Sequence, residues 1–213
     1  DGSAATPAVQ GADNNTGMFF PAADTIAFSE GGTEVLRLNA SGNAVFTGTI
    51  QVAGITTDIY PRVLGTAVAS TSGTSIDFTG IPSWVRRVTV MFNGVSTNGT
   101  NTPLVQLGAG SITSSGYVSA ASSSDGTTVS TSTAGFVVRS AAATNALTGP
   151  LTISTIGSNI WVIAGSLYNS AAGGVTTTTT GGVTLAGALD RVRITTVGGT
   201  DTFDAGSVNI LWE

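Results

Sequence analysis

The sequence contains no cysteine, no histidine and no lysine, and each absence excludes a class of chemistry. Without cysteine the chain forms no disulfides and no thiolate metal sites. Without histidine and cysteine, Ser-His-Asp and Cys-His triads and the usual zinc sites are excluded. Without lysine, Schiff-base chemistry and a P-loop lysine are excluded as well. We expect no cofactor and no metal site, since the spacing of Asp201 and Asp204, whose oxygens could bind calcium, matches no calcium-binding loop.

Charge is also scarce, and its sign is informative. Charged residues make up 9% of the chain, well under the roughly one quarter typical of soluble domains, so Ser, Thr, Asn and Gly must form much of the surface. Seven arginines and twelve acidic residues give a net charge of −5, which is the wrong sign for binding a phosphate backbone. No apolar run approaches the roughly 18 residues that span a bilayer. We expect neither nucleic acid as a partner nor membrane insertion.

Glycine, Thr, Val and Ile are abundant and favour strands and tight turns over helices. Beyond about residue 60, apolar residues recur with period two between Gly, Ser, Thr and Asn. The sets are Ile76 and Phe78; Val88, Val90 and Phe92; Phe136 and Val138; Leu151 and Ile153; Trp161, Ile163 and Leu167; Val192 and Ile194; Val208, Ile210 and Trp212. Seven or more strands with one buried face predict a β-sandwich or jelly roll.

The polar stretches between these sets are expected to be surface loops at the ends of the sandwich. They are 93–103, 108–115, 121–133 and 169–182.

The first part of the chain has a different pattern of short apolar clusters. The stretch "GGTEVLRLNASGNAVFTGTI", residues 31–50, predicts a hairpin. A lone hairpin is marginal in water, and fewer than about 60 residues with few large apolar side chains would struggle to form a core. We therefore expect other copies of the chain to cover its apolar residues, which are Val35, Leu36, Leu38, Val45 and Phe46.

Two regions of the sequence, one toward each end of the chain, contain recognisable motifs. "NTGMFFPAADTIAFSEGGTEVLRLNASGN" resembles a segment that precedes the distal end of many bacteriophage tail fibres. "IDFTGIPSWVRRVTVMFNGVSTNGT", together with "VRITTVGGTDTFDAGSVNILWE", is similar to a terminal domain of phage and prophage fibres. The "TDTFDAGSVNILWE" ending is more specific than the "GGTE" hairpin, and residues 108–182 contain no recognised motif.

The resemblance implies an all-β homotrimeric fibre tip. Residues 1–58 would form an intertwined trimeric shaft of short hairpins, and residues 59–213 a β-sandwich or jelly-roll-like head. The tip would attach the virion to a bacterial surface receptor, a polysaccharide or lipopolysaccharide. It would lie at the distal end of the tail fibre after assembly in the host cytoplasm, and other tail fibre or tail proteins would join through its N-terminal side.

We expect a binding protein and not an enzyme, with two alternatives left open. One is a depolymerase that uses two carboxylates, for which Asp201 and Asp204 are the closest pair in the head. Turn chemistry is the simpler interpretation of this pair, because Asp accepts hydrogen bonds from nearby backbone N–H groups. The other alternative is a purely structural fibre joint or cap.

Arginines and tryptophans of the head each have two interpretations. Arg86, Arg87, Arg191 and Arg193 either grip an acidic sugar or phosphate, or pair with neighbouring acidic residues, which we favour because carboxylates outnumber arginines. The tryptophans, which are Trp84, Trp161 and Trp212, either serve as platforms for sugar rings or lie in the core, which we favour because they are in phase with apolar neighbours.

The candidate receptor-binding residues are polar or aromatic residues near the predicted turns. Asparagines offer neutral donors and acceptors for sugar hydroxyls, although they are also ordinary turn formers. A tyrosine at a wet surface can stack on a sugar ring, although Tyr117 also fits a half-buried strand position. The predicted set is Asn93, Asn98, Asn101, Tyr117, Tyr168 and Asn169.

Overall fold

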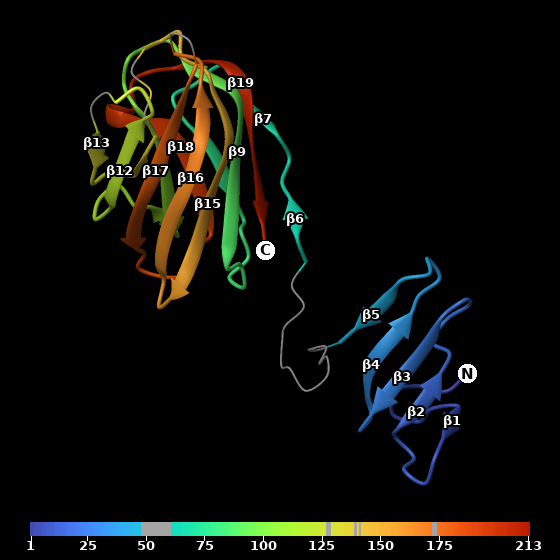
Figure 1. Ribbon diagram of the computed structural model, residues 1–213. Coiled ribbons are helices and arrows are strands. Elements are labelled where there is room, and N and C mark those ends of the chain that lie inside the picture. Colours follow the sequence, from blue (N-terminus) through green and yellow to red (C-terminus); the bar gives the residue numbers. More distant parts are fainter. Residues whose placement is uncertain (48–60, 127–128, 139, 141, 172–173) are drawn as a thin grey trace. The chain divides into compact units, whose positions relative to one another are not determined.

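A computed structural model describes residues 1–47, 61–126, 129–138, 140, 142–171 and 174–213 (Figure 1). The chain divides into two compact units, Asp1–Ile59 (unit 1) and Tyr60–Glu213 (unit 2). The boundary expected between residues 58 and 59 lies outside the described residues. Both units are built from antiparallel strands, which confirms the all-β prediction. Within the described ranges, no helix has the length and apolar character needed to cross a membrane.

Unit 1 is a five-stranded sheet in which every strand pairs with its neighbour in the chain. Its strands are β1 (Val9–Gln10), β2 (Gly17–Phe19), β3 (Ile26–Glu30), β4 (Thr33–Leu38) and β5 (Ala44–Phe46). The predicted hairpin is confirmed as far as the described residues extend. Its turn places Gly42 at a φ of 77°, where its N–H donates to the Asn39 carbonyl, and the left-handed conformation favours glycine there.

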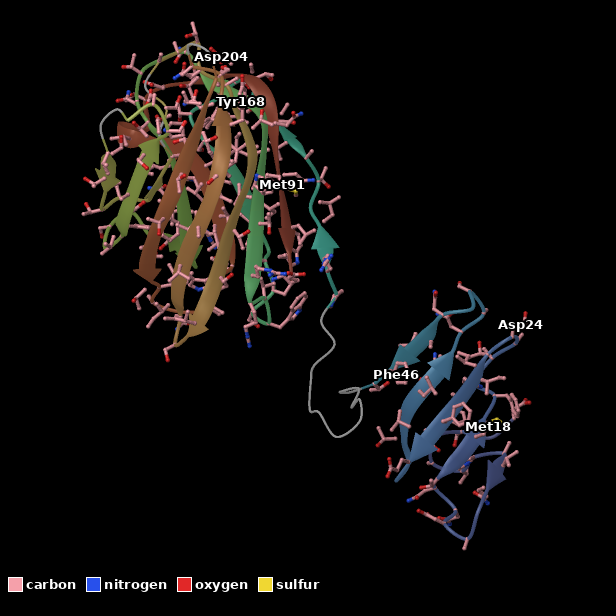
Figure 2. The ribbon with its side chains drawn as sticks, in the orientation of Figure 1. Met18, Asp24, Phe46, Met91, Tyr168 and Asp204 are labelled. Atoms are coloured by element: carbon pink, nitrogen blue, oxygen red, sulfur yellow. The ribbon has the colours of Figure 1, made fainter. Side chains whose placement is uncertain are left out.

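One face of the unit 1 sheet carries a continuous line of apolar side chains, which we call the apolar row. Direct pairing across the strands aligns Val9, Met18, Phe28, Leu36 and Phe46. Val9, Phe28 and Phe46 are 57%, 37% and 48% exposed. Figure 2 labels Met18 and Phe46, on the second and fifth strands. The row is therefore largely open to solvent within one chain.

The other face of this sheet contains the small core of unit 1. Phe19 is 4% exposed, and it pairs with Ala27, which is fully buried. Phe19 is the one large apolar side chain that is buried in the described part of unit 1. Val45 aligns with Arg37 and Ala27, so it does not share a face with Leu36. The apolar residues of the predicted hairpin are thus divided between two faces.

Unit 2 consists of two antiparallel sheets. The smaller one has the order β11-β10-β18-β8, with β14 also paired to β10, and the larger one has the order β13-β12-β17-β16-β15-β9-β19-β6, with β7 also paired to β19. The strands are β6 (Val63–Leu64), β7 (Val68–Ala69), β8 (Ile76–Thr79), β9 (Arg87–Thr97), β10 (Pro103–Ala109), β11 (Ser111–Ile112), β12 (Val118–Ser123), β13 (Ser130–Ser132), β14 (Phe136–Val137), β15 (Leu147–Gly157), β16 (Ile160–Asn169), β17 (Val175–Thr184), β18 (Arg191–Thr196) and β19 (Phe203–Trp212).

The core of unit 2 lies between these sheets and contains the residues that the period-two pattern predicts. Ile76 and Val192 of the smaller sheet belong to the same buried cluster as Val90 and Ile163 of the larger one. Trp161 is 3% exposed, and the other two tryptophans pack against the cluster. The two sheets therefore form a β-sandwich, and the prediction of buried tryptophans is confirmed in full for Trp161.

Part of the loop prediction is wrong, because strands occupy much of the polar stretches. The stretch 121–133 contains the end of β12 and all of β13, and 169–182 contains most of β17. Thr177 and Thr179 are fully buried, and their hydroxyls donate to the carbonyls of Ser122 and Val137 at 3.2 and 3.1 Å. Threonine is β-branched and therefore favours strands, and here its hydroxyl finds partners inside the sheet.

The strand directions give unit 2 two distinct ends. Val63 pairs with Trp212 and Trp212 with Val88, so the chain enters unit 2 where β19 finishes and β9 begins; we call this the entry end. β9 and β16 are each antiparallel to β15, so they run in the same direction and finish together at the opposite end. We call that opposite end the loop end. Figure 2 shows Tyr168 and Asp204 there.

Candidate functional site

Tyr168 is the most exposed of the described aromatic side chains of unit 2, with 56% of its surface open. It lies near the end of β16, where alternation turns Leu167 into the core and Tyr168 outward. Gly174 makes room for the ring, because a Cβ at this position would lie 2.9 Å from Tyr168 Cε2. The ring is therefore presented on the outer face of the larger sheet.

Polar residues on neighbouring strands flank this ring. Tyr168 pairs directly with Thr148 of β15 and Thr176 of β17, and both threonines are exposed. The Thr148 hydroxyl accepts a hydrogen bond from the Gly94 N–H at 3.0 Å, which brings the neighbouring residue Asn93 of β9 alongside. We call Tyr168, Thr148, Thr176 and Asn93 the Tyr168 surface. An aromatic face beside hydroxyl and amide groups suits the apolar face and hydroxyl edges of a sugar ring.

Two other predicted residues, Asn98 and Asn101, hold the loop end together. The Asn101 N–H and Nδ2 donate to the two carboxylate oxygens of Asp201 at 2.7 and 2.6 Å. The Asn98 Oδ1 accepts from the Thr202 N–H at 2.9 Å. These bonds fasten the β9–β10 loop to the segment that precedes β19. The contacts give both asparagines a structural role in the folded chain.

Asp201 and Asp204 each bind a different neighbour. Asp201 is 9% exposed and is occupied by Asn101, whereas Asp204 is exposed and accepts from the Ser96 hydroxyl. Both partners are distant in sequence, so these hydrogen bonds differ from the local turn chemistry that the sequence favours. In the described ranges, no three or more acidic side chains gather in a way that would hold a metal ion.

Replacing Asp201 with alanine is expected to destabilise unit 2 by about 1–3 kcal/mol, because the Asn101 N–H and Nδ2 both lose their acceptor. Urea unfolding followed by tryptophan fluorescence measures the loss. Asp204→Ala is the matched control, since this exposed carboxylate accepts one hydrogen bond from a side chain. Equal losses for the two variants would contradict the structural role of Asp201.

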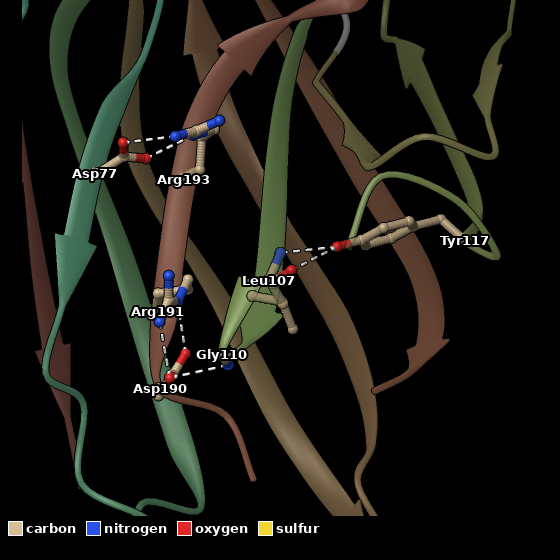
Figure 3. Close-up of polar contacts among 7 residues, drawn as sticks. All are labelled: Asp77, Leu107, Gly110, Tyr117, Asp190, Arg191 and Arg193. Atoms are coloured by element: carbon tan, nitrogen blue, oxygen red, sulfur yellow. Dashed lines mark hydrogen bonds and ion pairs between the residues drawn. The ribbon is translucent and has the colours of Figure 1, made fainter. Parts of the chain in front are cut away.

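Tyr117 and Asn169 differ from the prediction, because both side chains are buried. Tyr117 is 1% exposed and packs edge-to-face against Phe136 with ring centroids 5.0 Å apart. Its hydroxyl accepts from the Leu107 N–H at 2.7 Å and donates to the Leu107 carbonyl at 3.4 Å (Figure 3). Asn169 is 2% exposed, and its Oδ1 accepts from the Ala171 N–H at 3.0 Å. Neither side chain offers a surface to a receptor.

The Tyr117 hydroxyl is expected to make stability fall in alkaline solution. Burial raises its pKa to about 12, whereas the unfolded value is about 10. Below about pH 10 both states keep the proton, and between about pH 10 and 12 only the unfolded state loses it, so the free energy of unfolding decreases. Tyr117→Phe is expected to remove this decrease and to cost about 1–3 kcal/mol at neutral pH, because the Leu107 N–H loses its acceptor.

Thermal unfolding from pH 8 to pH 12 tests both effects, with Tyr168→Phe as the control that keeps a surface ring. An unchanged alkaline slope in Tyr117→Phe would contradict the assignment of this titration to Tyr117.

Ion pairing, favoured from the sequence, is confirmed for three of the four arginines considered. Arg191 pairs with Asp190 at 2.7 Å and Arg193 with Asp77 at 2.6 Å (Figure 3), and Arg87 pairs with Glu213. The hydrogen bond from Arg191 holds the pKa of Asp190 below its ordinary value. Surface pairs of this kind contribute little to stability. Arg86 does not follow this pattern, because it has no carboxylate partner among the described residues.

Comparison with protein families, curated proteins and solved structures found no significant match to this chain.

Proposed function

We propose that the chain forms the homotrimeric tip of a phage tail fibre and attaches the virion to a bacterial surface polysaccharide or lipopolysaccharide. The observation that carries the proposal is the apolar row of unit 1, which a single chain leaves open to solvent. Monomeric soluble proteins rarely expose contiguous apolar surface of this kind without a partner.

The composition of the apolar row favours sister copies as that partner. The row extends across all five strands and contains no charged side chain, so two rows can meet without electrostatic repulsion. Burying a Phe or Leu side chain contributes about 1.5–3 kcal/mol. Unit 1 has little internal core to stabilise it, because Phe19 is its one large buried apolar side chain among the described residues. Association of three copies, the number implied by the resemblance to tail fibres, supplies the missing core.

The Tyr168 surface is the proposed receptor-binding region of each head. It lies toward the loop end of unit 2, away from the entry end. Three such surfaces on one tip would raise the avidity for a repetitive polysaccharide, because the second and third contacts form at a high effective concentration. Other tail fibre or tail proteins would join at the N-terminal side.

Two measurements on the intact chain test the proposal. Sedimentation equilibrium at micromolar concentration is expected to give three times the 21.1 kDa chain mass. Labelled protein is expected to decorate susceptible bacteria, and soluble host polysaccharide is expected to compete. A stable monomer would contradict the assembly. A trimer that binds no host cell would favour the structural joint, and release of reducing ends from the polysaccharide would favour the depolymerase.

A further inference from the structure

A pocket opens at the entry end of unit 2, with a volume of about 520 Å³. Three segments line it: the chain leading into β9, the turn between β15 and β16, and the residues before β18. Its volume lies within the range of small-molecule sites. Tyr168 lies seven residues along β16 from Trp161, roughly 23 Å away at the rise of a strand. The pocket is therefore separate from the Tyr168 surface.

The first notable feature of this pocket is the indole nitrogen of Trp161. Trp161 is 3% exposed and lines the pocket, yet its Nε1 has no hydrogen-bond partner in the structure. A buried N–H without an acceptor has lost its hydrogen bond to water and gained none in return, which destabilises the fold. Most buried polar groups in native proteins are paired, and an unpaired one calls for a specific acceptor. The indole can only donate.

The second feature is Arg86, which also lines the pocket. Its Nη1 donates to the carbonyls of Ser83 and Val85 at 3.2 and 3.3 Å, and its Nε and Nη2 donate to no described residue. Each of the other five arginines in the described ranges forms a salt bridge, whereas Arg86 has no carboxylate partner there. The Nε and Nη2 edge of a guanidinium is suited to bind a planar anion with two hydrogen bonds.

The remaining lining residues are consistent with an anionic ligand. None of them is acidic, and Ser83, Ser158 and Asn159 supply hydroxyl and amide groups. A single arginine balances one negative charge, which is the charge of a carboxylate, whereas a phosphate monoester carries about two. The pocket is large enough for a sugar ring with its substituents.

We propose that this pocket binds the carboxylate of a monosaccharide-sized acid, such as a sugar acid. Arg86 holds the carboxylate through Nε and Nη2, and Trp161 donates its indole N–H to the same ligand. The hydroxyl and amide groups at the rim contact the hydroxyls of the ring. The proposal does not depend on the attachment function, since its residues are distinct from those of the Tyr168 surface.

Titration of glucuronate into the intact chain tests the proposal, by calorimetry and by the indole ¹⁵N–¹H signals of the three tryptophans. We expect glucuronate to bind and to shift the Trp161 signal while the Trp84 and Trp212 signals stay in place. Glucose is expected not to bind. Glucose 1-phosphate is expected to bind at least about tenfold more weakly than glucuronate.

Arg86→Gln is expected to weaken glucuronate binding by about tenfold or more. Arg62→Gln is the matched control, because Arg62 is an exposed arginine that pairs with Glu213 and does not line the pocket. Trp161→Phe removes the indole N–H and is expected to weaken binding as well. If that variant does not fold, Arg86→Gln still decides the question because its side chain is exposed.

Three results would overturn the proposal: a Trp161 signal that glucuronate does not move, equal binding of glucose, or preferential binding of the sugar phosphate. Glucuronate binding that is unchanged in Arg86→Gln would overturn it too.

Discussion

A Phe28→Ser, Phe46→Ser double variant is expected to sediment as a monomer at micromolar concentrations at which the unchanged chain is expected to sediment as a trimer. Both side chains belong to the apolar row and are 37% and 48% exposed in the single chain. Each Phe that becomes buried between copies contributes about 1.5–3 kcal/mol, and the double change removes six such side chains from a trimer. The loss greatly exceeds the 1.4 kcal/mol that changes an equilibrium constant tenfold.

The matched control is Ile156→Ser, because Ile156 is 70% exposed in unit 2 and lies outside the apolar row. The Ile156→Ser variant is expected to sediment with the same mass as the unchanged chain. Circular dichroism of the double variant checks that the strands remain formed. Trimers that persist in the double variant would show that the apolar row is not the contact between copies.

The sandwich of unit 2 could be predicted from the sequence because large apolar residues recur at every second position of its strands. Val88, Val90 and Phe92 alternate with the half-buried Thr89 and Met91, and all three are buried as expected. The alternation fails as a guide where the inward residues are not apolar. In β17 the inward positions include Thr177 and Thr179, and the sequence pattern cannot separate buried threonines from exposed ones. Their acceptors come from Ser122 and Val137, which are distant in sequence and known only from the fold.

The two tyrosines show how far the candidate site could be predicted. Trp161, Ile163 and Leu167 fix the inward phase of β16, and this phase turns Tyr168 outward. No such phase is available for Tyr117. The strand that follows it reverses the usual pattern, since Val118 is 79% exposed while Ser119 is 5% exposed.

The hydrogen bonds of Ser119 explain why this polar side chain is buried. Its hydroxyl accepts from the Val137 N–H at 2.9 Å and lies 3.4 Å from the Thr180 carbonyl, to which it donates. Thr148 and Thr176 of the Tyr168 surface were not singled out from the sequence. The available signal was the strand phase, which places Thr176 on the same face as Tyr168 once the register of β16 and β17 is known.

Replacing Tyr168 with alanine is expected to reduce attachment to susceptible bacteria by at least about tenfold per site, because stacking of a ring on a sugar and its flanking hydroxyl contacts would be lost. In the proposed trimer three sites would act together, so the loss of avidity is expected to exceed the loss at a single site. Tyr168→Phe keeps the ring and is expected to retain most of the binding. Binding of the labelled trimer to host cells, over a range of protein concentrations, measures each effect.

Val162→Ala is the matched control for Tyr168→Ala, because Val162 lies on the same face of β16 and is 38% exposed. It is expected to leave both attachment and assembly unchanged. The Tyr168→Ala trimer is expected to keep its mass, since the apolar row of unit 1 is untouched. Full attachment by an assembled Tyr168→Ala trimer would place the receptor contact elsewhere on the head. If Tyr168→Ala lost attachment and also sedimented below the trimer mass, Tyr168 would act through assembly.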